Sequence, residues 1–294
     1  MPIGALGAMC RDIRRQKINP LTEETKHKEK TSFDIKAGLE YYLPSVLKLI
    51  AGDIRWSSLT KILDYRFAEY AERHEKGERF DLRATLYSIS ASAGQGNESD
   101  IQFLSFIDNV FKSLAQILTE KEKQLIKPNV ANLLQYDHGF LHYLGELCVL
   151  NCIMTSGSYL LEKTEYKIDP KGKGIDFLFV NKETKTNFLV EVVNIELRAD
   201  KLTYHDLTKK FIEGKLQEKL HETDKSGVTN YILLPVFWGG KDNVNNILKV
   251  KDFYEKTNFN IDRVEIPRVY MQLKGGQQTF NKFGSLLKCL TLDK

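Results

Sequence analysis

Two apolar runs near the middle of the chain each contain a single acidic residue. The first is GIDFLFV, residues 174–180, with Asp176, and the second is NFLVEVVNI, residues 187–195, with Glu191. The polar segment NKETKT between them is typical of a turn, so the pattern predicts two strands. Both faces of each predicted strand are mostly apolar, which indicates a sheet that is covered on both sides. The two acids therefore stand in strands from which water is expected to be excluded.

A buried carboxylate needs a compensating partner. An ionised carboxylate that is buried alone loses several kcal/mol to desolvation, so it takes up a proton, pairs with a base or binds a cation. If Asp176 and Glu191 lie side by side on paired strands, a divalent ion removes their repulsion, and oxygen ligands suit Mg²⁺ or Mn²⁺. The alternatives are structural. Asp176 could satisfy a turn at the start of its strand, and Glu191 could pair with a core lysine or arginine.

A third acid, Glu146, stands in the apolar helical segment FLHYLGELCVLNCIM, residues 140–154, before the two strands. His138 and His142 precede Glu146 at spacings of four, so the three side chains can share one face of a helix. This spacing permits a transition-metal site. The alternative is that both histidines are partly buried helix residues close to the site.

The period of the apolar residues divides the chain into three regions. Residues 1–31 are predicted to form a loose basic arm, because most of them are charged or polar. Residues 32–135 repeat apolar side chains at intervals of three and four, which predicts a helical region. Within it, the small and polar segment 88–100, SISASAGQGNESD, is predicted to be a linker or long loop. Residues 136–294 mix strands with helices. They predict an α/β domain with a mixed sheet flanked by helices.

Further elements complete the predicted α/β domain. EYKID, residues 165–169, is a candidate short strand before the two acidic strands. The amphipathic segment 202–223 predicts a helix, and TNYILLPVFW, residues 229–238, predicts another strand. RVEIPRVYMQL, residues 263–273, is predicted to be an edge strand because it contains a proline, Pro267.

Composition limits the class of protein. Of the 294 residues, 42% are hydrophobic and 28% are charged, as in ordinary globular domains. The net charge of +4 permits a nucleic-acid partner without requiring one. Four cysteines in a chain of this length do not make a disulfide framework, and no stretch approaches the roughly 20 apolar residues of a membrane helix. The first apolar residues precede the basic ones, in the opposite order to a secretory signal, so a cytoplasmic location without membrane contact is expected.

In chain order, the acidic segments resemble the core of the restriction-endonuclease-like superfamily, the PD-(D/E)xK nucleases. The matching pieces are Glu146 in LHYLGELCVL, Asp176 in KGIDFLF and Glu191 in FLVEVVN, followed by a helix and a strand. The resemblance covers about residues 138–240. It implies a restriction-endonuclease-like fold, in which Asp176 and Glu191 bind Mg²⁺ or Mn²⁺, Glu146 is a further ligand or orients a water, and the ion promotes hydrolysis of a DNA phosphodiester.

The sequence departs from the family pattern at two positions. Ile175 stands where the motif has proline, and Val193 stands where it has the catalytic lysine. The family sometimes supplies this group from elsewhere. Lys215 and Lys219, four residues apart on the helix that follows, are candidates, and Lys173 is another. Otherwise these are lysines whose ammonium groups extend into solvent.

Three functional hypotheses follow. The first is a magnesium-dependent DNA endonuclease of the restriction or defence type, in which the helical region recognises DNA or mediates oligomerisation, for example as a homodimer. Its basic segments RDIRRQK, residues 11–17, and KHKEK, residues 26–30, could then reach phosphates. The second, favoured by Val193, is a catalytically inactive module of the same fold that binds nucleic acid or a protein partner. The third is an interaction protein whose acids are structural.

Overall fold

A computed structural model of the chain describes part of its residues. The described residues are 35–50, 56–57, 61, 65, 68, 72, 75–77, 86–135, 139–167, 170, 174–196, 214–224, 230–239, 249, 252, 263–272 and 278–282. They belong to two compact units, of which one contains 113–128 and the residues from 141 onward, and the other contains the residues up to 112 together with 129–140. The predicted arm lies outside the described residues.

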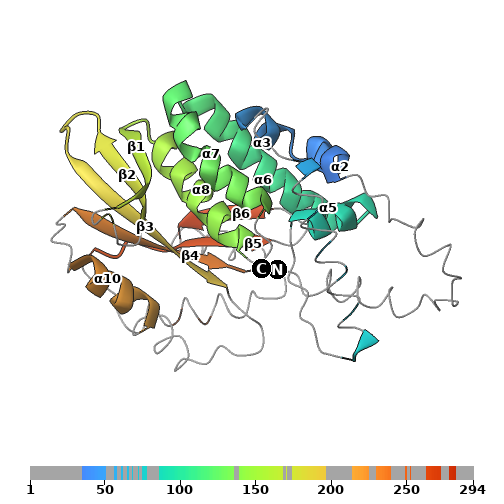
Figure 1. Cartoon of the computed structure of the whole chain (residues 1–294). Helices are drawn as coiled ribbons and strands as arrows, with labels where there is room; N and C mark the ends of the chain where they lie inside the picture. The colour runs from blue at the N-terminus through green and yellow to red at the C-terminus, as the bar shows by residue number, and fades with distance from the viewer. Residues whose placement is uncertain are drawn as a thin grey trace, which may run out of the picture. The chain divides into compact units, whose positions relative to one another are not determined.

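A six-stranded mixed sheet forms the centre of the first unit (Figure 1). The spatial order of the strands follows the sequence, from β1 at one edge to β6 at the other. The parallel pairs are β3–β4 and β4–β5, and the other neighbours are antiparallel. The chain is therefore an α/β protein with a mixed sheet, as predicted. The strands are β1 Tyr159–Tyr166, β2 Ile175–Asn181, β3 Asn187–Glu196, β4 Tyr231–Trp238, β5 Arg268–Gln272 and β6 Gln278–Lys282.

The two acidic strands, β2 and β3, are buried on both faces. Their register pairs Phe177 with Val190 and Phe179 with Phe188, and the rings of Phe179 and Phe188 stack at 5.3 Å between centroids. Leu178 and Leu189 pair on the opposite face and are also buried. Because alternate residues of a strand face opposite ways, Glu191 belongs to the face that carries the leucine pair.

Helices α8 Phe140–Thr155 and α10 Gln217–Asp224 flank the sheet in this unit (Figure 1). The side chain of Asn194 in β3 donates to the carbonyl of His142 in α8, at 3.1 Å. Glu191, three residues earlier in β3, pairs with Lys219 in α10. Residues three apart in a strand face opposite sides, so the two helices contact opposite faces of β3.

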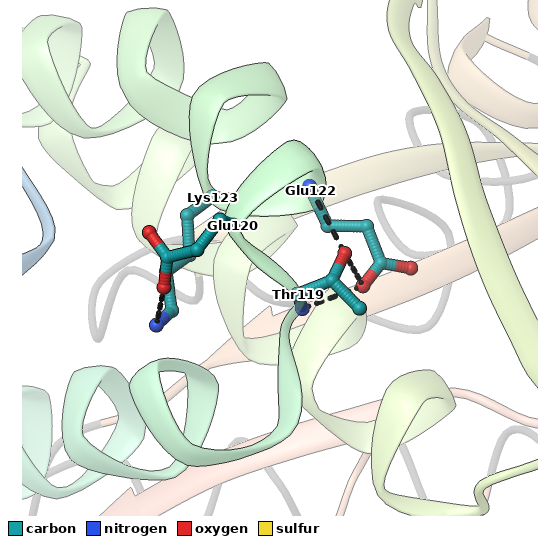
Figure 2. Close-up of polar contacts among 4 residues, drawn as sticks. All are labelled: Thr119, Glu120, Glu122 and Lys123. Carbon is teal, nitrogen blue, oxygen red and sulfur yellow. Dashed lines mark hydrogen bonds and ion pairs between the residues drawn. The ribbon is translucent and has the colours of Figure 1, made fainter.

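The side chain of Glu122 links the edge strand β1 to the beginning of helix α7 Glu120–Gln135. Figure 2 shows that Thr119 and Glu122 form a capping box, in which the N–H of Thr119 donates to Glu122 Oε2 at 2.8 Å. The second oxygen of Glu122 accepts from the N–H of Leu161 in β1, at 3.0 Å. Thus a single buried carboxylate caps the helix and also accepts a hydrogen bond from a backbone N–H group at the edge of the sheet.

We expect Glu122→Ala to lower the free energy of unfolding by about 1–3 kcal/mol, because it leaves the N–H groups of Thr119 and Leu161 without their acceptor. Glu120→Ala is the matched control, since Glu120 stands in the same turn, is 84% exposed and contacts only Lys123 in Figure 2. The control is expected to change stability by no more than about 0.5 kcal/mol. Urea denaturation measures both changes, and equal losses would contradict this account of Glu122.

The second unit, in its described residues, is built from helices. The N–H of Ser45 in α3 donates to Asp108 in α6 at 2.7 Å, and the hydroxyl of Tyr87 in α5 donates to the carbonyl of Leu134 in α7, also at 2.7 Å. Apolar side chains such as Leu104 and Phe111 are fully buried. Its helices are α2 Ile35–Tyr42, α3 Pro44–Leu49, α5 Leu86–Gly94, the first part of α6 Glu98–Ile117 and the last part of α7.

The linker predicted over 88–100 is wrong. Helix α5 continues to Gly94, and α6 begins at Glu98 after a short turn. Ser90 and Ala93 are buried, so the small residues of this segment serve close packing of a helix. Residues that favour turns when exposed are compatible with a helix when its surface must approach another one.

The edge-strand prediction for 263–273 is also wrong, because β5 pairs with β4 on one side and with β6 on the other. Pro267 stands one residue before β5 begins, so its missing N–H removes no hydrogen bond from the ladder. The short strand predicted over 165–169 is observed earlier, as β1. Of the helix predicted over 202–223, the structure describes a π-helical turn at 214–216 and α10, and the rest lies outside the described residues. None of the helices among the described residues has the length and apolar character needed to span a bilayer.

Candidate metal centre

Asp176 lies at the point where the pairing of β2 and β3 ends. The paired residues run from Val180 with Asn187 to Phe177 with Val190. One position further, the carboxylate of Asp176 accepts the backbone N–H of Val192 at 2.6 Å. A side chain has therefore taken the place of a backbone acceptor, which holds the carboxylate between the two strands.

Two further carboxylates converge on Asp176. Oxygens of Glu146 in α8, Glu165 in β1 and Asp176 in β2 all lie within 4.8 Å of one another. Glu146 is buried and Glu165 is exposed, so the group extends from the interior to the surface. Three carboxylates at this separation repel one another strongly unless protons or a cation are present. Such a set of hard oxygen donors fits a divalent ion such as Mg²⁺ or Mn²⁺.

Glu165 reaches this group from an unusual backbone conformation. Its φ is +48°, in the left-handed region, which costs a residue with a side chain about 1 kcal/mol or more. Gly174 makes room for it, because a Cβ at position 174 would lie 2.7 Å from Glu165 Oε2 and 3.2 Å from its backbone. The register on either side, Thr164 with Phe177 and Tyr166 with Ile175, sets Glu165 opposite Asp176.

Burial and like charge act together on the central acid. Burial raises the pKa of Asp176 well above its usual value, and the charges of Glu191, Glu146 and Glu165 raise it further, while the hydrogen bond from Val192 opposes the shift. Ionised Asp176 is thus held in a site that favours its neutral form. A bound cation reverses that preference, because its positive charge stabilises the ionised carboxylate.

Glu191 lies next to this group and carries its own counter-charge. Its Oε1 forms an ion pair with the ammonium of Lys219, whose side chain is 34% exposed. Burial raises the pKa of Glu191, and the Lys219 charge and the backbone N–H of Asp176 lower it. The other oxygen, Oε2, is buried and has no hydrogen-bond partner in the part of the chain that the structure describes.

Asn194 in β3 links the site to helix α8 and strand β4. Its side-chain amide donates to the carbonyl of His142, and its Oδ1 accepts the indole N–H of Trp238 at 2.9 Å. Its own backbone carbonyl accepts the ammonium of Lys215, at 3.1 Å. A Cβ at Gly145 would lie 1.9 Å from Asn194 Oδ1, so α8 approaches β3 this closely only with glycine at that position. Glu146 follows Gly145 directly, and the close approach therefore positions its carboxylate.

The residues singled out in the sequence occupy different places. Glu146 and Asp176 belong to the three-carboxylate group, and Glu191 stands beside it. Of the lysine candidates, Lys219 contacts Glu191, whereas Lys215 contacts the carbonyl of Asn194. His142 stands on α8 with part of its side chain exposed, and the partial burial of its ring and the nearby Lys215 charge lower its pKa, while the Glu196 charge opposes this shift. His138 and Lys173 lie outside the described residues.

Sequence reasoning missed Glu165. A signal for it exists, because EYK and GID are separated by a short glycine-containing segment, and an antiparallel pairing of the two sets residue 165 opposite residue 176. Its left-handed backbone gave no signal, because glutamate seldom adopts that conformation.

The site defines a class of centre, a cluster of carboxylates with an adjacent lysine on an α/β sheet, that suits a divalent cation. Comparisons of the chain with protein-family models, curated proteins and solved structures found no match. Function must therefore be inferred from the side chains of the site.

Proposed function

We propose that the protein is a metal-dependent nuclease with a restriction-endonuclease-like fold, which hydrolyses phosphodiester bonds in DNA. The observation that carries this proposal is the convergence of Glu146, Glu165 and Asp176, whose carboxylate oxygens lie within 4.8 Å of one another. The order α8, β2, β3, α10 and β4 supports the proposal, although β1 stands between α8 and β2, where the resemblance has no strand.

The three carboxylates would hold one Mg²⁺ or Mn²⁺ ion. Bound there, the ion supplies Lewis-acid activation of water and neutralises charge on the phosphate. The raised pKa of Asp176 supports this role, since groups perturbed by burial and by like charges in one cluster are common at functional sites.

Lys219 is the best candidate for the lysine that Val193 replaces. Its ammonium contacts Glu191, which stands beside the carboxylate group. Hydrolysis joins the oxygen of water to phosphorus and breaks one P–O ester bond. The water loses a proton, and the leaving oxygen gains one. A lysine ammonium beside the site stabilises the negative charge that develops on the phosphate and helps to orient the water.

A second candidate function is binding without cleavage. Val193 can neither donate a proton nor stabilise negative charge, and this favours an inactive module of the same fold that binds nucleic acid or a protein partner. The two candidates differ in a simple respect, because only the nuclease requires both the cation and Lys219.

The direct test is incubation of the protein with supercoiled, linear and single-stranded DNA in the presence of Mg²⁺, Mn²⁺ or EDTA. We expect cation-dependent cleavage, and a loss of at least about 100-fold in rate for Lys219→Met. Lys215→Met is the matched control on the same helical segment and is expected to retain most of the activity. Cleavage that persists in EDTA would contradict the proposal, and DNA binding without cleavage in any cation would support the inactive module.

A further inference from the structure

Two glutamates on neighbouring strands stand on either side of Asp176, namely Glu165 in β1 and Glu191 in β3. The family pattern assigns the cation to Glu191. We propose that Glu165 is the cation ligand in its place, and that Glu191 instead holds Lys219 through Oε1 and the attacking water through Oε2. This inference rests on the proposed nuclease function and assigns separate roles to Glu165 and Glu191 in it.

The geometry around Glu165 fits a ligand. Its carboxylate oxygens lie within 4.8 Å of oxygens of both Glu146 and Asp176, so one ion can contact all three residues. The exposure of Glu165 gives this position contact with solvent, as the entry of a hydrated ion requires. Divalent cations of this kind take several oxygen ligands, and the three carboxylates supply them from three different elements.

The geometry around Glu191 fits another role. Glu191 does not belong to the group of three, and one of its oxygens is already engaged by the Lys219 ammonium. The residue is only 5% exposed, and its second oxygen has no hydrogen-bond partner among the described residues, although the backbone N–H of Asp176 lies near the carboxylate. A buried carboxylate oxygen without a donor is rare in folded proteins and marks a place for a small donor molecule.

Water is the donor that the proposed reaction requires. The carboxylate of Glu191 lies against the backbone N–H of Asp176, so a molecule bound to Oε2 would be close to the cation site. Glu191 would then bring together the two participants that do not ligate the ion, the lysine and the nucleophile. It is a positioning residue, since it acts on the reaction through Lys219 and the water.

The two roles predict different defects. Glu165→Gln is expected to weaken Mn²⁺ binding at least about tenfold, because it removes an anionic ligand. Glu191→Gln is expected to leave Mn²⁺ affinity within about threefold of the wild type while kcat for DNA cleavage falls about 100-fold, with KM little changed. Lys219→Met is expected to give the same kinetic defect, and the double variant Glu191→Gln/Lys219→Met is expected to be no slower than either single variant.

The experiment is calorimetric titration of the full-length chain with Mn²⁺, together with steady-state cleavage of a plasmid. Glu162→Gln, three residues earlier in β1 and paired with Lys121 at 3.5 Å, is the control for Glu165→Gln and is expected to bind Mn²⁺ normally. Glu165→Gly provides a second variant, since glycine adopts the left-handed backbone without strain. Melting curves without metal verify the fold of each variant.

The inference is overturned if Glu165→Gln and Glu165→Gly bind Mn²⁺ as the wild type does, or if Glu191→Gln loses Mn²⁺ affinity as severely as they are expected to. In either case a wild-type protein that binds Mn²⁺ and cleaves DNA would still support the proposed function. A wild-type protein that neither binds Mn²⁺ nor cleaves DNA would overturn both.

Discussion

Asp176→Asn is expected to make the metal-free protein more stable and to abolish cleavage. The variant keeps an oxygen that can accept the N–H of Val192, so the local hydrogen bond is retained. It removes a charge that is held among three other carboxylates in a site from which solvent is largely excluded. Without its central ligand, the cation site loses its affinity, and we expect cleavage to fall by at least about 1,000-fold.

The stabilisation is expected to depend on pH with a definite sign. The folded-state pKa of Asp176 lies above its unfolded value, so the favourable contribution of this residue is complete below the unfolded pKa and is lost as pH rises through the folded pKa. Asparagine does not titrate. The melting temperatures of wild type and variant should therefore coincide in acid and diverge as the pH rises, with the variant the more stable.

Mn²⁺ should reverse the order of stability. At a concentration of about 100 times Kd, a ligand that binds only the folded state contributes about 2.7 kcal/mol, and this increment is expected for the wild type and not for Asp176→Asn. Because protons compete for the carboxylates, the increment should shrink as pH falls. Asp100→Asn is the control, since Asp100 is also buried with a raised pKa but belongs to α6, outside the cluster. It should respond to Mn²⁺ as the wild type does, and a Mn²⁺ response retained by Asp176→Asn would exclude Asp176 as a ligand.

Gly145→Ala is expected to destabilise the protein, although alanine favours a helix over glycine by about 1 kcal/mol. The added Cβ would lie 1.9 Å from Asn194 Oδ1, so α8 and β3 must separate or the amide must leave its bonds with His142 and Trp238. Overpacking of this kind costs about 1–3 kcal/mol, and the unpaired polar groups add about as much again. We expect a net loss of about 2 kcal/mol or more in the free energy of unfolding.

The same substitution should also affect the site, because Glu146 is the next residue in α8. A displacement of about 1 Å can cost 100-fold in rate, so weaker Mn²⁺ binding and slower cleavage are expected together. The double variant Gly145→Ala/Asn194→Ala provides the control, since it removes the group with which the methyl collides. It should be less destabilised than the sum of the single variants, and denaturant titration measures the difference. A higher melting temperature for Gly145→Ala alone would contradict the close contact.

The two acidic strands could be predicted because their signal is local. Alternation of side chains and a polar turn predicted strands at 174–180 and 187–195, and β2 and β3 are observed at Ile175–Asn181 and Asn187–Glu196. Segment 88–100 misled because its serine and glycine residues favour turns when they are exposed, whereas part of the segment is buried in a helix. The burial of Ser90 and Ala93 depends on distant residues, which no local pattern contains.

The lysines illustrate the same limit. Lys215 and Lys219 are four residues apart on one helical segment, and the sequence offers no reason to prefer either of them. Their contacts separate them, since Lys219 reaches Glu191 and Lys215 reaches the carbonyl of Asn194. Which ammonium approaches an acid depends on the orientation of α10 over the sheet, a property of the assembled unit.

The sequence by itself determined the α/β class, the mixed sheet and the burial of carboxylates in its central strands, because periodicity and the cost of desolvating charge act within a few residues. Only the tertiary structure decided that Glu165 joins Glu146 and Asp176, and that Glu191 pairs with Lys219. Those contacts depend on strand register, on the left-handed backbone at residue 165 and on the approach of α8 permitted by Gly145, and each of these arises from residues far apart in the chain.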